Sequence, residues 1–124
     1  MDVLRIGYVG VRTAEVERTT AFFRDVLGLE AAGENQTVTF TRLPAHRHDL
    51  IEVYAPGHDD ERMIPQGVDF MIAFVVDDVE QALTEVKAAG LEIIGDLVWA
   101  APAFGWFFVR APDGRAYAIE QTPE

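Results

Sequence analysis

The sequence predicts an α+β fold in which two tandem βαβββ units form curved mixed sheets around a cleft. Apolar, strand-like runs begin at Tyr8 and again at Met71, 63 residues later. A helical pattern follows each run and ends in a Gly-Leu-Glu sequence, at Gly28 and at Gly90. Further strand-like runs follow each helix. Repetition at a nearly constant offset, 63 residues for the strands and 62 for the glycines, is typical of a duplicated structural unit.

The first predicted unit spans residues 1–57. Its helix begins with Thr13 as the N-cap and ends at Gly28. Apolar and small residues at spacings of three and four predict a buried helix face, formed by Val16, Thr19, Phe23, Val26 and Leu27. Two strands, 37–43 and 49–55, are expected after the helix, joined by a polar loop.

The second predicted unit spans residues 67–124, and the polar stretch 56–66 joins it to the first. Asp77 or Asp78 caps its helix, and Gly90 ends it. The buried stripe of this helix consists of Val79, Ala82, Leu83 and Val86. Three strands follow, at 91–99, 105–110 and 115–121, and a Pro-Asp-Gly turn precedes the last strand.

Composition narrows the classes of function. The 124 residues suit a single domain, 1–124, and carry 10 Lys and Arg against 21 Asp and Glu, a net charge of −11. This charge argues against nucleic acid as a partner, because binding to phosphates depends on Lys and Arg. The absence of cysteine excludes disulfides and thiolate metal sites. With no apolar run long enough to span a membrane and no secretion signal, we expect a cytoplasmic protein without membrane contact.

Two motifs carry a family resemblance. Residues 21–29, Ala-Phe-Phe-Arg-Asp-Val-Leu-Gly-Leu, resemble an "FY-x-x-x-LG" helix end, and residues 108–114, Phe-Val-Arg-Ala-Pro-Asp-Gly, resemble an "F-x-x-DPDG" turn. With the duplicated unit, they resemble the vicinal oxygen chelate superfamily, which includes glyoxalase I, extradiol dioxygenases, and fosfomycin and bleomycin resistance proteins. The resemblance implies the predicted fold. It also implies a homodimer in which units from two chains complete a cleft.

The metal positions of that superfamily fall here on Tyr8, Glu52, Met71 and Ala118. Only Glu52 is a good ligand for a divalent ion, because alanine has no donor and a thioether is soft. We therefore expect no metal and no cofactor, and no metal-dependent glyoxalase or dioxygenase activity.

Two other sets of residues are alternatives for a metal site. Glu120 lies two residues beyond Ala118 and shares its strand face, but the displacement is about 6–7 Å. His46 and His48 lie on one side of the polar loop, where solvent-exposed histidines are the simpler interpretation.

Strand alternation predicts the lining of the cleft. On the strand from Met71, the residues Phe70, Ile72, Phe74 and Val76 face the helix, so the intervening ones face the cleft. Residues 99–106 are rich in aromatics and are interpreted as a loop over the cleft. The candidate ligand-binding residues are Tyr8, Arg12, Glu52, Tyr54, Met71, Trp99, Phe104, Trp106, Phe108, Arg110 and Glu120.

An aromatic cleft with one or two carboxylates suits a small, partly aromatic organic ligand, with a cation as the favoured charge. The main hypothesis is a sequestration or antibiotic-resistance protein of the bleomycin-resistance type, which needs no catalysis. A second hypothesis is a metal-independent isomerase or lyase in which Glu52 transfers a proton. A third is a divalent-metal lyase or dioxygenase with a rearranged site.

Overall fold

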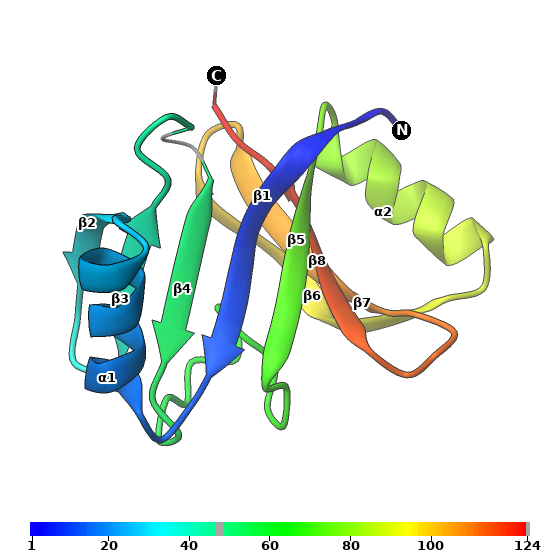
Figure 1. The fold of residues 1–124 in the computed structure, drawn as a ribbon. Coiled ribbons are helices and arrows are strands. Elements are labelled where there is room, and N and C mark those ends of the chain that lie inside the picture. The colour runs from blue at the N-terminus through cyan, green and yellow to red at the C-terminus, as the bar shows by residue number, and fades with distance from the viewer. Residues whose placement is uncertain (47–48, 124) are drawn as a thin grey trace.

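A computed structural model describes residues 1–46 and 49–123, in which eight strands form one curved sheet with two helices on its outer face (Figure 1). This arrangement confirms the predicted α+β class. The strands are β1 (Val3–Arg12), β2 (Glu30–Glu34), β3 (Val38–Arg42), β4 (Leu50–Tyr54), β5 (Phe70–Val76), β6 (Glu92–Ala101), β7 (Phe104–Arg110) and β8 (Ala116–Gln121). The helices are α1 (Val16–Ala21), continued by the π-helical segment η1 (Phe22–Val26), and α2 (Val79–Ala88).

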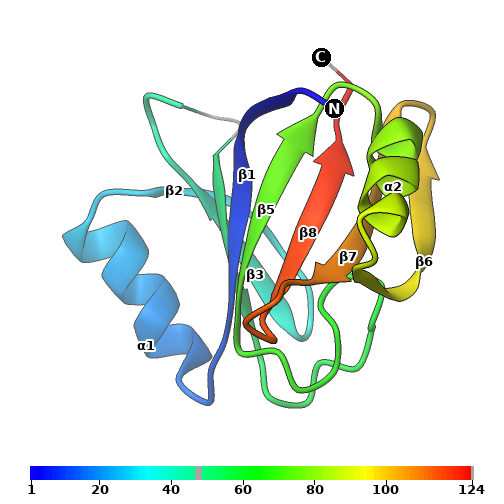
Figure 2. The ribbon, with the colours of Figure 1, turned by 90° about the vertical axis from the view of Figure 1, so that its right-hand side faces the viewer.

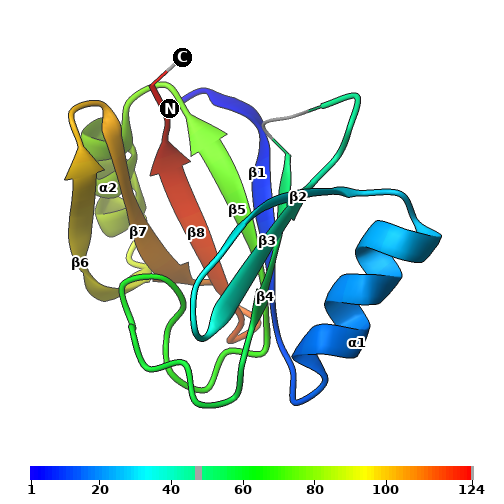
Figure 3. The ribbon, with the colours of Figure 1, turned by 90° about the vertical axis from the view of Figure 1, so that its left-hand side faces the viewer.

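The strand order is β2-β3-β4-β1-β5-β8-β7-β6. In each half the first strand pairs in parallel with the last, β1 with β4 and β5 with β8. The two halves join through the antiparallel pair β1–β5 at the centre of the sheet. Both halves therefore follow one strand order, and the sheet curves around an inner, concave face (Figures 2 and 3).

Strand alternation divides the apolar residues between the two faces of the sheet, as predicted. Phe70, however, was expected to face the helix and is 59% exposed, because α2 packs on β7 and β8. Phe107 and Val109 of β7 and Ile119 of β8 are buried in the cluster that includes the stripe of α2. Their neighbours Phe108 and Ala118 are buried in a second cluster, on the inner face. The inner face therefore has its own apolar core.

Helix α2 forms as the sequence predicts. The side chain of Asp78, at the N-cap, accepts a hydrogen bond of 3.0 Å from the backbone N–H of Gln81. Val79, Ala82 and Val86 are buried, and Leu83 packs against the same cluster. Gly90 follows with a φ of 80°, the left-handed conformation that ends many helices.

The prediction for the first helix was partly wrong. Val26 and Leu27, expected in the buried face, are 72% and 54% exposed. The backbone N–H of Leu27 bonds to the carbonyl of Phe22, five residues earlier, and this π-type turn rotates the helix end off the expected face. The N-cap is Glu15 rather than Thr13. The Thr13 hydroxyl nevertheless accepts a hydrogen bond from the backbone N–H of Glu15.

Two segments differ further from expectation. Strand β2 has the sequence Glu-Ala-Ala-Gly-Glu, which lacks the β-branched and aromatic residues that identify strands. Residues 99–106 are not a loop, because β6 continues to Ala101 and a tight turn leads into β7. Ala103 in that turn has a φ of 61°, which allows the chain to reverse within two residues. Among the described residues, no helix has the length and apolar character required to span a membrane.

Candidate functional site

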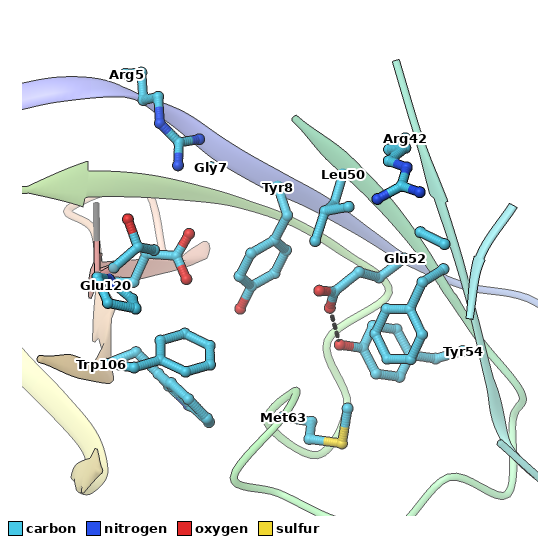
Figure 4. Close-up of a pocket in the computed structure, with 15 residues that line it drawn as sticks. Arg5, Gly7, Tyr8, Arg42, Leu50, Glu52, Tyr54, Met63, Trp106 and Glu120 are labelled. Atoms are coloured by element: carbon cyan, nitrogen blue, oxygen red, sulfur yellow. Dashed lines mark hydrogen bonds between the residues drawn. The ribbon is translucent and has the colours of Figure 1, made fainter. Parts of the chain in front are cut away.

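A cavity of about 690 Å³ lies on the inner face of the sheet. Strands from both halves line it, and Met63, from the segment between β4 and β5, lies at its edge (Figure 4). Its apolar wall includes five aromatic side chains, Tyr8, Phe40, Tyr54, Phe104 and Trp106. Among the described residues, its ionisable side chains include two carboxyls, Glu52 and Glu120, and two guanidiniums, Arg5 and Arg42.

Glu52 projects into this cavity from β4, next to the central strand. Its side chain is buried, with the residue 8% exposed, and its Oε1 accepts a hydrogen bond from the Tyr54 hydroxyl (Figure 4). Burial raises the pKa of Glu52 to about 7, although the bond from Tyr54 acts in the opposite direction. Burial and the neighbouring Glu52 also raise the pKa of Tyr54, which therefore stays a proton donor.

Glu120 reaches the same cavity from β8, in the other half of the sheet. The residue is 6% exposed, and burial raises its pKa to about 7, while Arg5 acts to lower it. Its carboxyl occupies space that glycine leaves open, since a Cβ built on Gly7 would overlap its Oε1. The cavity thus holds two buried carboxyls that both titrate near neutral pH.

Tyr8 lies between these two carboxyls in the close-up (Figure 4). Its ring is buried, and burial, with Glu52 and then Glu120, raises the pKa of the phenol well above its ordinary value. Tyr8 therefore remains protonated at neutral pH. It can donate a hydrogen bond to a carboxylate or to a ligand in the cavity.

A family model described as the Glyoxalase/Bleomycin resistance protein/Dioxygenase superfamily matches residues 5–119, nearly the whole chain. The chain belongs to this superfamily. The match confirms the resemblance drawn from the two sequence motifs. No curated protein sequence matches the chain.

Solved structures of the superfamily's fold resemble the chain over nearly all of its length. A hypothetical protein from Bacillus halodurans C-125 has a TM-score of 0.73 at 19% identity, with 97% of this chain and 95% of that one covered. Methylmalonyl-CoA epimerase from Mycobacterium tuberculosis gives 0.73 at 18% identity, covering 98% and 90%. The Mn(II)-bound glyoxalase from Novosphingobium aromaticivorans gives 0.74 at 24% identity, covering 95% and 38%. These similarities extend to the fold alone.

The structure brings six of the eleven predicted site residues together in the wall of the cavity. They are Tyr8, Glu52, Tyr54, Phe104, Trp106 and Glu120. Phe104 and Trp106 form an aromatic pair with ring centroids 5.4 Å apart. Whether these residues bind a ligand stays a prediction.

The other five predicted residues lie away from the cavity wall. Met71 and Phe108 are on the inner face but buried beneath the surface in its apolar core. Trp99 packs against Gly105, where a Cβ would come within 2.5 Å of its ring. Arg12 bonds to backbone carbonyls between β4 and β5, including that of His58 at 2.8 Å. Arg110 bonds to the Gly114 carbonyl at 2.8 Å, within its own hairpin.

Sequence reasoning missed several residues that line the cavity. They are Arg5, Gly7, Ala32, Phe40, Arg42, Leu50, Met63, Thr122 and Pro123. Phe40 and Arg42 could have been found, because β3 pairs with β4 and alternation places them on the face of Glu52. Arg5 could not have been found, because the pairing register of β1 with β5 shifts between Ile6 and Val9. This irregularity brings Arg5 to the cavity side, where strict alternation from Tyr8 would place Ile6.

The residues at the superfamily's metal positions do not fit a divalent ion. Met71 and Ala118 are buried in the apolar core, and Tyr8 keeps its proton. Glu52 is the one good ligand of the four, and it already accepts the bond from Tyr54. Three ligands or more are the usual requirement of a protein metal site.

The alternative metal ligands are also separate from these positions. His46 is exposed on the loop after β3, and His48 lies outside the described residues. Among the described residues there is no group of three or more His, Asp or Glu side chains placed to hold a metal ion. Glu120 lies in the cavity, two residues beyond Ala118 on β8. The ligand position of the superfamily on this strand is therefore occupied by an alanine, which has no donor atom.

Proposed function

We propose that the chain binds a small, partly aromatic organic cation in a metal-free pocket, as a sequestration or resistance protein does. The observation that carries this proposal is the burial of two carboxyls, Glu52 and Glu120, in one aromatic-walled cavity. The volume of about 690 Å³ lies within the range of sites for small organic ligands. Aromatic faces and buried carboxylates both attract organic cations. The net charge of −11 would also draw a cation toward the surface.

The affinity of such a ligand should depend on pH. A cation favours the ionised form of each carboxyl, and both carboxyls titrate near pH 7. Affinity should therefore rise between about pH 6 and pH 8, with release of protons on binding. Calorimetry with phenethylamine as the probe, in buffers of different ionisation enthalpy, measures both effects.

A pair of matched variants tests the role of the buried carboxyl. Glu52→Gln retains an acceptor for Tyr54 and should weaken phenethylamine binding at pH 8 by at least about tenfold. Glu34→Gln changes an exposed glutamate of β2 and should have no effect. Equal binding of phenethylamine by wild type and Glu52→Gln would contradict the proposal. A failure of wild type to bind phenethylamine would also contradict it.

A second candidate function is metal-independent proton transfer by Glu52, of the isomerase or lyase type. The specific observation in its favour is a buried carboxyl with a pKa of about 7 that receives the Tyr54 hydroxyl. A general base or acid is most efficient when its pKa lies near the working pH. In deuterium oxide, an enzyme would exchange an acidic C–H of its bound ligand. Glu52→Gln should then abolish exchange while binding persists, whereas a sequestration protein exchanges nothing.

The proposal includes a homodimer that forms through the outer face, rather than one in which units from two chains complete the cleft as the resemblance implies, because both halves of one chain already line the cavity. Helix α1 packs on β3 and β4 and α2 on β7 and β8, which leaves β1 and β5 uncovered between them (Figure 1). Leu4, Ile6 and Phe70 of these strands are 58%, 51% and 59% exposed. Exposed apolar strips of this kind mark contact surfaces. A second copy is the favoured occupant, because these apolar side chains let two acidic chains meet in a self-complementary, two-fold contact.

A further inference from the structure

Arg42 has hydrogen-bonding capacity that the described residues do not use. It lies in the cavity wall at the end of β3, with its guanidinium directed toward the cavity (Figure 4). Its Nε is buried and, within residues 1–46 and 49–123, has no hydrogen-bond partner. The nearest carboxylate oxygen, Oε2 of Glu30, is 3.9 Å from Nε, beyond hydrogen-bonding distance. A buried N–H without a partner costs free energy, so an unpaired donor in a cavity wall points to an acceptor on a ligand.

The second guanidinium in the cavity differs in this respect. Arg5 has a carboxylate 3.5 Å away on Asp49, contacts the Ile6 carbonyl at 3.4 Å, and acts on the pKa of Glu120. Arg42 has a longer ion pair, with Glu30 at 3.9 Å, and its buried Nε has no hydrogen-bond partner among the described residues. Arg42 is therefore the guanidinium of the cavity that is better placed to receive an anion.

The sheet register places Arg42 beside Glu52. Arg42 lies opposite Leu50, and Phe40 lies opposite Glu52, so Arg42 and Glu52 are diagonal neighbours on one face. Diagonal neighbours in an antiparallel pair are about 7–8 Å apart, within reach of two long side chains. An unpaired N–H and a buried carboxyl thus face the same small volume. Phe40, opposite Glu52 and two residues from Arg42 on β3, can contact an apolar group.

We propose that Arg42 forms an anion subsite next to Glu52, so that the ligand is an aromatic zwitterion with an ammonium and a carboxylate. A guanidinium binds a carboxylate through two parallel hydrogen bonds, which suits this group above other anions of the same charge. The inference rests on the proposed function, which supplies the cation subsite at Glu52. It adds the second charge of the ligand and the residue that selects it.

Three probes with a common phenyl group separate the two subsites. L-Phenylalanine carries both charges, phenethylamine carries the cation alone, and hydrocinnamate carries the anion alone. We expect wild type to bind phenylalanine about tenfold more tightly than phenethylamine, because only phenylalanine pairs with Arg42. Calorimetry at pH 8 measures each affinity.

Variants of Arg42 then identify the residue responsible. Arg42→Gln should remove the advantage of phenylalanine. It should not weaken phenethylamine binding, because the guanidinium repels a cation. Arg42→Lys keeps the charge without the planar fork and should retain part of the advantage. Arg18→Gln, at an arginine with an 85% exposed side chain, is the control and should change nothing. Urea unfolding of each variant checks that the fold is retained.

The outcomes distinguish this inference from the proposed function. If phenethylamine binds as tightly as phenylalanine and Arg42→Gln alters neither, the anion subsite is wrong and the cation site stands. If hydrocinnamate alone binds and Arg42→Gln weakens it, the anion subsite stands and the cation site is wrong. If no probe binds, both are overturned.

Discussion

The carboxyl of Glu120 packs against the backbone of Gly7. A Cβ at position 7 would overlap Oε1 of Glu120 and would also come 2.8 Å from Cγ2 of Val75. Gly7 is fully within β1, and the space over its Cα is what allows an acidic side chain from β8 to lie buried in the cavity. The position of Glu120 is therefore set by a residue of the opposite half of the sheet.

The first prediction concerns Gly7→Ala. The new methyl group must displace the end of Glu120 and press on Val75, so we expect a loss of stability of about 1–3 kcal/mol. Because the displaced carboxyl leaves its place in the cavity, affinity for phenethylamine should fall as well. Urea unfolding and calorimetry measure the two effects.

Gly57→Ala is the matched control for this substitution. Nothing lies within 4 Å of a Cβ built at Gly57, so the same chemical change should leave stability and binding close to wild type. Wild-type affinity in Gly7→Ala would show that the position of Glu120 does not matter for the ligand.

The second prediction is that stability falls as pH rises. Glu52 and Glu120 have pKa values of about 7 in the folded protein against 4.5 ordinarily, so the folded state holds more protons between these values. The contribution of these two carboxyls to the free energy of unfolding is therefore highest below about pH 4.5. It declines up to about pH 7 and is constant at higher pH. Each carboxyl contributes a decline of roughly 3 kcal/mol.

Glu52→Gln tests this decline. Glutamine does not ionise, so the variant should lose about half of the decrease in unfolding free energy between about pH 4.5 and pH 7. Glu34→Gln, which changes an exposed carboxyl, should follow the wild-type curve. An unchanged slope in Glu52→Gln would mean that this carboxyl has an ordinary pKa. Urea unfolding across the range gives the curves.

The third prediction assigns the fluorescence signal of binding. Trp106 lines the cavity and donates from Nε1 to the Arg62 carbonyl at 2.5 Å, whereas Trp99 is 45% exposed and packs on Gly105. Phenethylamine should therefore change the emission of Trp106 and leave that of Trp99 unchanged. Trp99→Phe should keep the ligand-dependent change, and Trp106→Phe should lose it. A signal that disappears in Trp99→Phe alone would place the ligand elsewhere.

The fourth prediction concerns assembly. Ile6→Lys places a charge in the uncovered strip between the helices, where Ile6 is 51% exposed. We expect wild type to be a dimer in light scattering at micromolar concentration and the variant to be a monomer. Ala100→Lys, at an exposed position of the edge strand β6, should remain a dimer. A monomeric wild type would contradict the proposed contact.

Much of the fold could be predicted, because local signals and tertiary structure agree. The cap at Asp78 is a local signal at one residue. The stripe of α2 and the alternation along β7 each follow a single periodicity. The first helix was harder, since a π-type turn at Phe22 changes the periodicity without a sequence signal. Strand β2 was missed because it is held by pairing with β3 rather than by its own composition.

The site was predicted where it depends on alternation and missed where it depends on irregular backbone. Glu52 and Trp106 follow from alternation along regular strands. Arg5 depends on the register shift in β1, which only the pairing with β5 reveals. Met63 depends on the path of a segment outside the strands, expected as a polar joint but carrying the fully buried Ile64.

The register of the sheet also makes the two halves of the cavity unequal. Gly10 of β1 pairs with Glu52, whereas Ala73, which is 63 residues later on β5, pairs with Ala118. The counterpart of Glu52 in the second half is thus an alanine, and Glu120 is displaced by two residues along its strand. Although the strand order repeats, the charges do not. The two ends of the cavity therefore differ, so a ligand that contacts both carboxyls should bind in one orientation rather than in two equivalent ones.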